Sequence, residues 1–166
     1  MAFLTVEETD WAHPDAVALR RAMYDDLAAL YPAETAAAEA AGGFDALDSR
    51  TAGRILVTVV ARVDGRPAGC GSVARLDAPP SSQAGVGELK KVFVRPDARR
   101  AGVARGLLDA LEAAAQERGL TALLLETGVR QGPAIRLYED AGYEPVAPFA
   151  PHGPDPTSVF LGKRLG

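Results

Sequence analysis

The sequence predicts an α/β protein in which helices cover both faces of a mixed, mostly antiparallel sheet of about six to seven strands. Two β-rich runs flank Asp64-Gly65, a dipeptide that favours a two-residue hairpin turn. Farther along, strand-like and helix-like segments alternate. The 166 residues, 48% of them hydrophobic, are enough to bury the core of one domain spanning 1–166.

The first half of the chain is expected to form a strand, two helices and the hairpin. Proline and an acidic residue favour a helix start, and paired glycines interrupt a helix. The expected elements are a strand in FLTVEE, a helix opened by Pro14 and Asp15 and ended by Pro32, a helix over Glu34 to Ala41 broken by Gly42-Gly43, and the hairpin strands around Asp64-Gly65.

The second half is expected to begin with an exposed loop and to end with two strands. Proline and glycine again mark the boundaries. The expected elements are a loop over 79–87, a strand from Gly87 to Val94 stopped by Arg95-Pro96, a helix from near Gly102 to Arg118-Gly119, a strand over Ala122 to Glu126, a helix from Gly132-Pro133 to Gly142, and strands over Tyr143 to Val146 and Ser158 to Arg164.

The helix that begins near Gly102 has an unusual start. Its buried face is a stripe at helical spacing, made of Val103, Leu107, Leu108, Leu111, Ala114 and Ala115. A helix N-terminus carries partial positive charge, so acidic residues are usual there, yet the segment 99–105 holds three arginines. Its glycine and alanines leave the backbone N–H groups accessible, which predicts a phosphate site.

Composition excludes several other classes of protein. A net charge of −4 and a pI near 5.2 argue against nucleic-acid binding and are compatible with a cationic substrate. One cysteine, Cys70, and two distant histidines predict no disulfide framework and no metal site. The chain has no apolar run of ~20 residues, so we expect a cytoplasmic protein without membrane contact. The segment after Gly102 also lacks the Gly-Lys-Ser/Thr of a P-loop, and no three-glycine dinucleotide fingerprint follows an early strand.

Two segments, ELKKVFVRPDARRAGVARGLLDAL and PAIRLYEDAGY, together resemble the GCN5-related N-acetyltransferase (GNAT) family. The first contains the acyl-coenzyme A signature of the family, formed here by Arg99, Gly102 and Ala104. The second contains Tyr138 and the dipeptide Gly142-Tyr143. The resemblance covers nearly all of 4–164 and is strongest over 87–145. Many members carry asparagine where this chain has Gln131.

The resemblance implies acetyl-coenzyme A as cosubstrate, no metal, and direct acetyl transfer to a primary amine of a small molecule or peptide. It also implies a sheet splayed at the fourth strand, and the broken alternation of ELKKVFV around Lys91 favours a β-bulge there. The residues implied to bind the cofactor are Val92, Phe93, Val94, Arg99, Arg100, Ala101, Gly102, Val103, Ala104, Arg105 and Gln131.

Two residues are candidates for catalysis. An alkylamine with a pKa near ~10 arrives protonated, so a base is needed, and Glu88 lies where family members with a glutamate base carry it. The alternative is a solvated carboxylate paired with Lys90. Tyr138 is implied to protonate the leaving sulfur, and the alternative is a core aromatic residue.

The single cysteine and the two histidines are not assigned a catalytic role. Cys70 is expected to be a small buried residue, because direct transfer needs no nucleophilic cysteine. His13 is expected near a helix N-terminus. His152 lies in a late loop that resembles the border of the acceptor pocket in family members.

Two functions remain open at this stage. One is an N-acetyltransferase, and the other is a non-catalytic acyl-coenzyme A binding or sensing domain. The presence of both Glu88 and Tyr138 favours the enzyme. The sequence does not name the acceptor amine, and it leaves a homodimer open.

Overall fold

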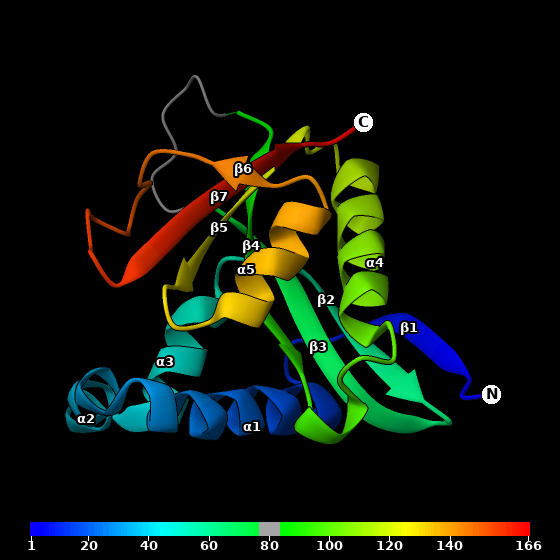
Figure 1. Ribbon diagram of the computed structural model, residues 1–166, viewed down its shortest axis with the longest axis horizontal. Coiled ribbons are helices and arrows are strands. Elements are labelled where there is room, and N and C mark those ends of the chain that lie inside the picture. Colours follow the sequence, from blue (N-terminus) through cyan, green and yellow to red (C-terminus); the bar gives the residue numbers. More distant parts are fainter. Residues whose placement is uncertain (77–83) are drawn as a thin grey trace.

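A seven-stranded sheet with strand order β1-β2-β3-β4-β5-β7-β6 organises the computed structural model, which describes residues 1–76 and 84–166 (Figure 1). The strands are β1 Leu4–Thr9, β2 Ile55–Val63, β3 Arg66–Arg75, β4 Val86–Val94, β5 Ala122–Gly128, β6 Glu144–Pro145 and β7 Ser158–Arg164. Among the described strands, only β4 and β5 pair in parallel. The predicted mixed, mostly antiparallel sheet is therefore confirmed.

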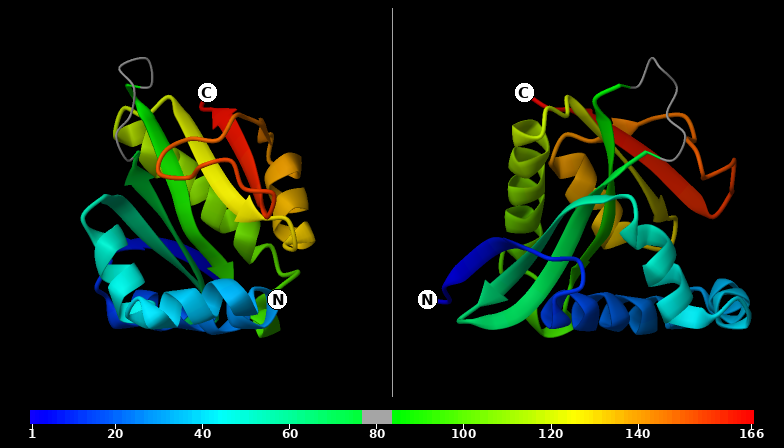
Figure 2. Two further views of the ribbon diagram at one scale, coloured as in Figure 1. Left: turned by 90° about the vertical axis from the view of Figure 1, so that its left-hand side faces the viewer. Right: turned by 180° about the vertical axis from the view of Figure 1, so that it is seen from behind.

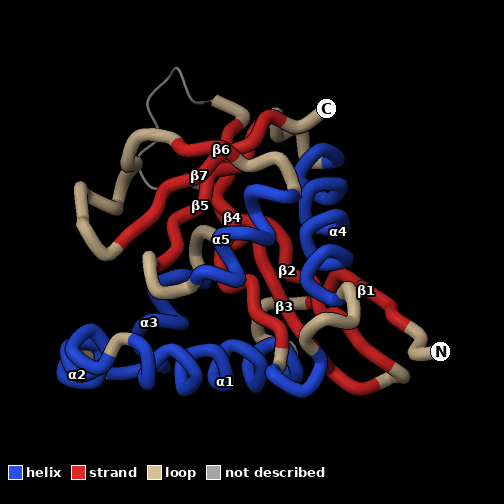
Figure 3. The backbone as a smooth tube through the Cα atoms, viewed as in Figure 1, coloured by secondary structure: helices blue, strands red, loops and turns tan. Residues whose placement is uncertain are grey.

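Five α-helices and one 3₁₀ turn connect these strands in the described residues. They are α1 Pro14–Leu30, α2 Pro32–Ala40, α3 Gly43–Ala52, η2 Pro96–Ala98, α4 Val103–Glu117 and α5 Gly132–Asp140. The connection between β6 and β7 is a long loop, drawn tan in Figure 3. Part of the expected loop 79–87 falls on 77–83, outside the described residues.

Helices pack on both faces of the sheet, as predicted, and Figure 2 shows them from two further sides. Neighbouring residues of a strand point to opposite faces. Val59 accordingly belongs to the large core cluster formed with α4 and α5. Val60 belongs to a second cluster with Leu19 of α1 and Phe93 of β4. The stripe predicted on α4 is confirmed, because all six of its residues are buried.

The parallel pairing of β4 and β5 ends after only three residues, where Glu88 opposes Leu124. Beyond that point β4 contains the predicted bulge. Lys91 has a positive φ of 58°, and the register with β3 shifts between the pairs Cys70–Phe93 and Ser72–Lys90. The two strands diverge from here, so the expected splay at the fourth strand is confirmed.

One helix was not predicted from the sequence. The pair Gly42-Gly43 does end the helix before it, as expected, since α2 stops at Ala40. Gly42 also adopts a φ of +107° and forms the N-cap of α3, which begins at Gly43. The only large apolar side chain that α3 buries is Phe44, so its sequence carries little amphipathic signal. The helix is held instead by long-range contacts, including the edge-to-face packing of Phe44 with Tyr24.

The close approach of β3 to β4 depends on Gly69. A Cβ atom at this position would lie 2.6 Å from the backbone oxygen of Phe93 and 3.0 Å from Leu107. We expect Gly69→Ala to lower the free energy of unfolding by about 1–3 kcal/mol, measured by chemical denaturation. The control is Gly53→Ala, since a Cβ at Gly53 meets nothing within 4 Å. Equal stability of the two variants would contradict this packing.

Candidate active site

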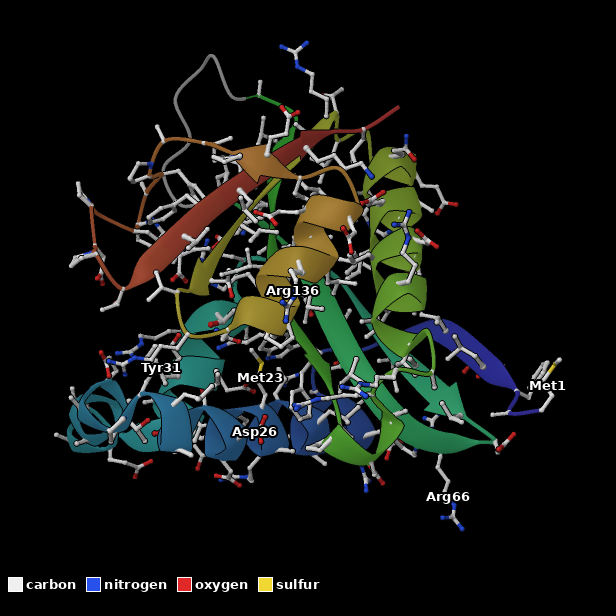
Figure 4. All side chains as sticks on the ribbon, viewed as in Figure 1. Met1, Met23, Asp26, Tyr31, Arg66 and Arg136 are labelled. Atoms are coloured by element: carbon white, nitrogen blue, oxygen red, sulfur yellow. The ribbon has the colours of Figure 1, made fainter. Side chains whose placement is uncertain are left out.

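A cavity of about 410 Å³ lies where β4 and β5 diverge. Residues of α1 to α3 line it from one side, and residues of β4, β5, α5 and the start of β7 line it from the other. Figure 4 labels Met23, which lines this cavity from the side of α1 that faces the sheet. Glu88 and Tyr138, the two catalytic candidates, both line the cavity.

Glu88 is buried, with 1% of its surface exposed, and is surrounded by positively charged or hydrogen-bonding groups. Its Oε1 lies 2.9 Å from Nε2 of His152 and 3.3 Å from Nζ of Lys90. Its Oε2 accepts a hydrogen bond of 3.3 Å from Arg54. Glu88 is therefore paired with Lys90, as the alternative interpretation held, but it is not solvated.

These partners determine the ionisation of Glu88. Burial by itself raises the pKa of the carboxyl group. The hydrogen bond with His152 and the positive charges of Lys90 and Arg54 outweigh that effect, so the net pKa lies below the ordinary value. Glu88 is thus an ionised acceptor at neutral pH, and Nε2 of His152 donates to it.

Tyr138 projects from α5 into the region between the core and the cavity. Its ring packs edge-to-face on Tyr143, with centroids 5.8 Å apart, and 7% of the residue is exposed. Burial raises the pKa of the phenol, so Tyr138 stays protonated throughout the physiological range and can donate a proton or hydrogen bond. Tyr138 is thus a core aromatic residue, as the alternative interpretation held, and it also lines the cavity, while its role in protonating sulfur stays a prediction.

The N-terminus of α4 is open, as the sequence suggested. Gly102 is the N-cap residue with a φ of +76°, no side chain caps the helix, and its first turn contains no acidic residue. A Cβ at Gly102 would meet nothing within 4 Å. Ala101 is exposed and Ala104 half-buried, whereas the side chain of Val103 is buried in the core. Backbone N–H groups at this end are thus accessible to an anion.

Two of the three arginines in this segment have protein partners. Arg99 donates to Asp26 at 2.9 Å and to the carbonyl of Val94 at 3.0 Å. Arg105 pairs with Asp109 one turn along α4, at 3.0 Å. The third, Arg100, is exposed with a φ of 67° and has no ion pair with another described residue.

The remaining candidates for cofactor binding divide into two groups. Val92 and Gln131 line the cavity directly. Phe93 turns toward α1 and packs with Leu19, whereas Val94 packs against the core cluster beneath α4. The side chains of Phe93 and Val94 therefore do not line the cavity, and these two residues can contribute only backbone groups.

The other residues singled out in the sequence lie as follows. Cys70 is buried, so the expectation of a small buried residue is confirmed, and burial raises the pKa of its thiol to about 12. His13 is the N-cap of α1 and accepts a hydrogen bond of 3.2 Å from the backbone N–H of Asp15, as expected. His152 reaches Glu88 from the loop between β6 and β7.

Several polar residues of the site were missed. Arg54 follows α3 and reaches Glu88 from 34 positions away, which no local pattern encodes. Glu126 lines the cavity and accepts a hydrogen bond of 2.7 Å from Ser158. Arg20 also lines the cavity. For Arg20 there was a signal, since it falls one turn from Ala16 and Met23 on the apolar face of α1.

Residues 1–76 and 84–166 contain no group of three or more histidine, cysteine, aspartate or glutamate side chains placed to hold a metal. No helix in the same residues is long and apolar enough to span a membrane.

The fold and the site define a class of protein. A mixed sheet that opens after a short parallel pair, beside a helix whose bare N-terminus follows the fourth strand, is the architecture of the acyl-coenzyme A acyltransferases that the sequence resembles. The model of the acetyltransferase (GNAT) family matches residues 19–143. The chain belongs to this family, whose members are acyltransferase enzymes.

Similar proteins agree with this assignment. An IAA acetyltransferase from Azospirillum brasilense is 46% identical over 107 residues, which are 64% of this chain and 67% of that protein. A crystal structure from Klebsiella pneumoniae, assigned as an acyl-CoA N-acyltransferase, has 31% identity, a TM-score of 0.75 and 99% coverage of both chains. The PaiA N-acetyltransferase of Thermoplasma acidophilum, solved with coenzyme A, shares the fold at 13% identity with a TM-score of 0.69, covering 98% of this chain and 99% of that one.

The lowered pKa of Glu88 gives a prediction for stability. A carboxyl group with a lowered pKa in the folded state stabilises the protein above its unfolded pKa, and this contribution is lost as the pH falls through the folded value. We expect Glu88→Gln to cost about 1–3 kcal/mol of unfolding free energy at pH 7 and progressively less below pH 4. Urea denaturation at several pH values measures this difference. The exposed Glu144→Gln is the control and should show little change at any pH. A cost that does not vary with pH would contradict the ionised pairing.

Proposed function

We propose that this protein is an acetyl-coenzyme A-dependent N-acetyltransferase that transfers the acetyl group directly to a primary amine. The proposal rests on the observation that both catalytic candidates line one cavity. Glu88 on β4 and Tyr138 on α5 line the same space at the point where β4 and β5 diverge. A proton acceptor and a proton donor on different elements of one cavity suit a reaction that takes a proton from one atom and gives one to another.

The residues available for the cofactor fit a pyrophosphate and a thioester arm. The N-terminus of α4 offers N–H groups over residues 100–105, and Arg100 adds an exposed positive charge. Past the bulge, the backbone of Val92 to Val94 is no longer paired with β5. Its N–H groups are our candidates for holding the arm and for hydrogen bonding to the thioester oxygen as charge develops there.

The protonated amine loses one proton to Glu88, directly or through one water molecule, and its neutral nitrogen attacks the carbonyl carbon. The carbon–sulfur bond then breaks, and Tyr138 supplies a proton to the departing sulfur. The second proton of the nitrogen leaves as the amide forms and restores the phenol, while Glu88 releases its proton to solvent. Because the pKa of Tyr138 is raised, its proton is in place at neutral pH. Because the pKa of Glu88 is lowered, its carboxylate is ionised at neutral pH and can accept a proton, but it is a weak base.

The cofactor site can be tested with a pair of glycines at the two ends of α4. Gly102 and Gly119 have φ values of 76° and 79°, and a Cβ at either meets nothing within 4 Å. We expect Gly102→Asp to abolish coenzyme A binding in calorimetry, because the new carboxylate repels the pyrophosphate. Gly119→Asp carries the same charge and similar backbone strain, and it should bind normally. Unchanged affinity in Gly102→Asp would overturn the proposed phosphate site.

The two catalytic roles predict different pH profiles in an assay of thiol release from acetyl-coenzyme A. Glu88→Gln should lower kcat/KM by about 10²–10⁴ near pH 7. This loss should shrink as the pH approaches the pKa of the amine, where the substrate arrives neutral. Tyr138→Phe should lower kcat with no such relief, because the native phenol stays protonated over this range.

The first assay needs a panel of amines, amino acids, polyamines, aminoglycosides and peptides. If coenzyme A binds but no acceptor in the panel releases thiol, a non-catalytic acyl-coenzyme A binding or sensing domain becomes the better interpretation. Activity of Glu88→Gln equal to the parent at pH 7 would leave Glu88 a purely structural partner of Lys90.

A further inference from the structure

We propose that the acceptor carries an anionic group besides its amine, and that Lys91 and Arg20 bind this group, which makes a free amino acid the favoured substrate class. This inference rests on the proposed acetyl transfer and extends it to the acceptor. It starts from two positively charged side chains that line the cavity and take no part in the chemistry described above.

Lys91 is the first of the two. The bulge in β4 breaks the alternation of the strand, so Lys91 lines the cavity together with its neighbours Glu88 and Lys90. Lys90 pairs with Glu88, but no described residue forms a hydrogen bond or ion pair with the ammonium group of Lys91. Burial and the nearby positive charges of Lys90 and Arg20 lower the pKa of Lys91, and the charge of Asp48 only partly opposes them, so an anion bound here would stabilise the ammonium form.

Arg20 on α1 is the second. It is 2% exposed, and its guanidinium group stacks on Trp11, with Cζ 3.4 Å from the ring centroid. Nε and Nη2 form a bidentate pair with Asp48 at 2.7 and 2.8 Å, and Nη2 also donates to the carbonyl of Trp11. Nη1 is buried and has no partner among the described residues, and it is the only such side-chain atom there. An unpaired buried donor of this kind needs an acceptor, which an ordered water or an anionic ligand can supply.

The charged side chains around Arg20 and Lys91 carry a net positive charge. Arg20 and Lys91 contribute two positive charges and Asp48 one negative charge, and all three line the same cavity. The rest of the cavity is acidic, with Glu34, Glu126 and Asp155. A molecule with an ammonium group and a carboxylate matches this separation. Its amine can reach the divergence of β4 and β5 while its carboxylate lies near α1.

Part of the cavity lining is apolar. Met23, Leu27 and Leu47 line the same cavity as Arg20, so they suit an uncharged side chain of the acceptor. The acceptor that fits both the charges and the walls is an amino acid with an apolar or aromatic side chain and a free carboxylate.

The test compares phenylalanine with phenylalaninamide, which differ only in the carboxylate. The amide has the less basic amine, so a preference for the acid cannot arise from amine ionisation. We expect kcat/KM for phenylalanine to exceed that for the amide by about 10- to 100-fold, the usual effect of a charge-assisted hydrogen bond. In Lys91→Met this ratio should fall to within about threefold, with coenzyme A affinity unchanged. The exposed Arg66→Met on the β2–β3 hairpin, labelled in Figure 4, is the charge-matched control.

A binding measurement separates this inference from the proposed function. Calorimetry with N-acetylphenylalanine and N-acetylphenylalaninamide needs no turnover, and the wild-type protein should bind the acid more tightly. If no amine is acetylated but this binding preference exists, the proposed function fails and the anion site stands. Equal turnover of the acid and amide, or equal binding of the two products, would overturn the anion site. If Lys91→Met does not fold, the wild-type comparison still decides.

Discussion

The divergence of β4 and β5 is the constraint on which the rest of this structure depends. Their parallel pairing lasts for three residues, ends at Glu88 and Leu124, and is followed by the bulge at Lys91. A sheet that stayed paired would leave no cavity, because side chains would fill the space between the strands and the helices. The same divergence unpairs the backbone of β4 just before the chain turns through η2 into α4, so the open strand and the bare helix N-terminus are consecutive in the sequence.

Features encoded within one element were predictable from the sequence. The stripe of α4 gave the buried face of that helix because apolar residues at helical spacing must share one side. The hairpin at Asp64-Gly65 followed from two residues that tolerate positive φ, which the structure shows at 49° and 80°. The bulge followed from a lysine that interrupts the alternation of β4. Each of these rests on the local geometry of the backbone.

Features that depend on contacts between distant segments were not predictable. The environment of Glu88 is assembled from Arg54 and His152, which lie 34 and 64 positions away, so a candidate base was predictable but its ionisation state was not. Helix α3 has one large buried apolar residue and is fixed by contacts with α1. Arg20 interrupts the apolar face of α1, and only its pairing with Asp48 shows why a charge is tolerated there.

The alternation of β4 also explains why one strand carries opposite charges into one cavity. Glu88 and Lys90 lie two positions apart and share a face, and the bulge adds Lys91 to the same side. Lys90 forms an ion pair with Glu88, and together with Arg54 it keeps that carboxylate ionised. Lys91 is left without a described partner beside Arg20, whose charge Asp48 already balances. The bulge therefore both opens the strand toward β5 and supplies the excess positive charge, which connects the proposed cofactor site and the proposed anion site to a single distortion of the backbone.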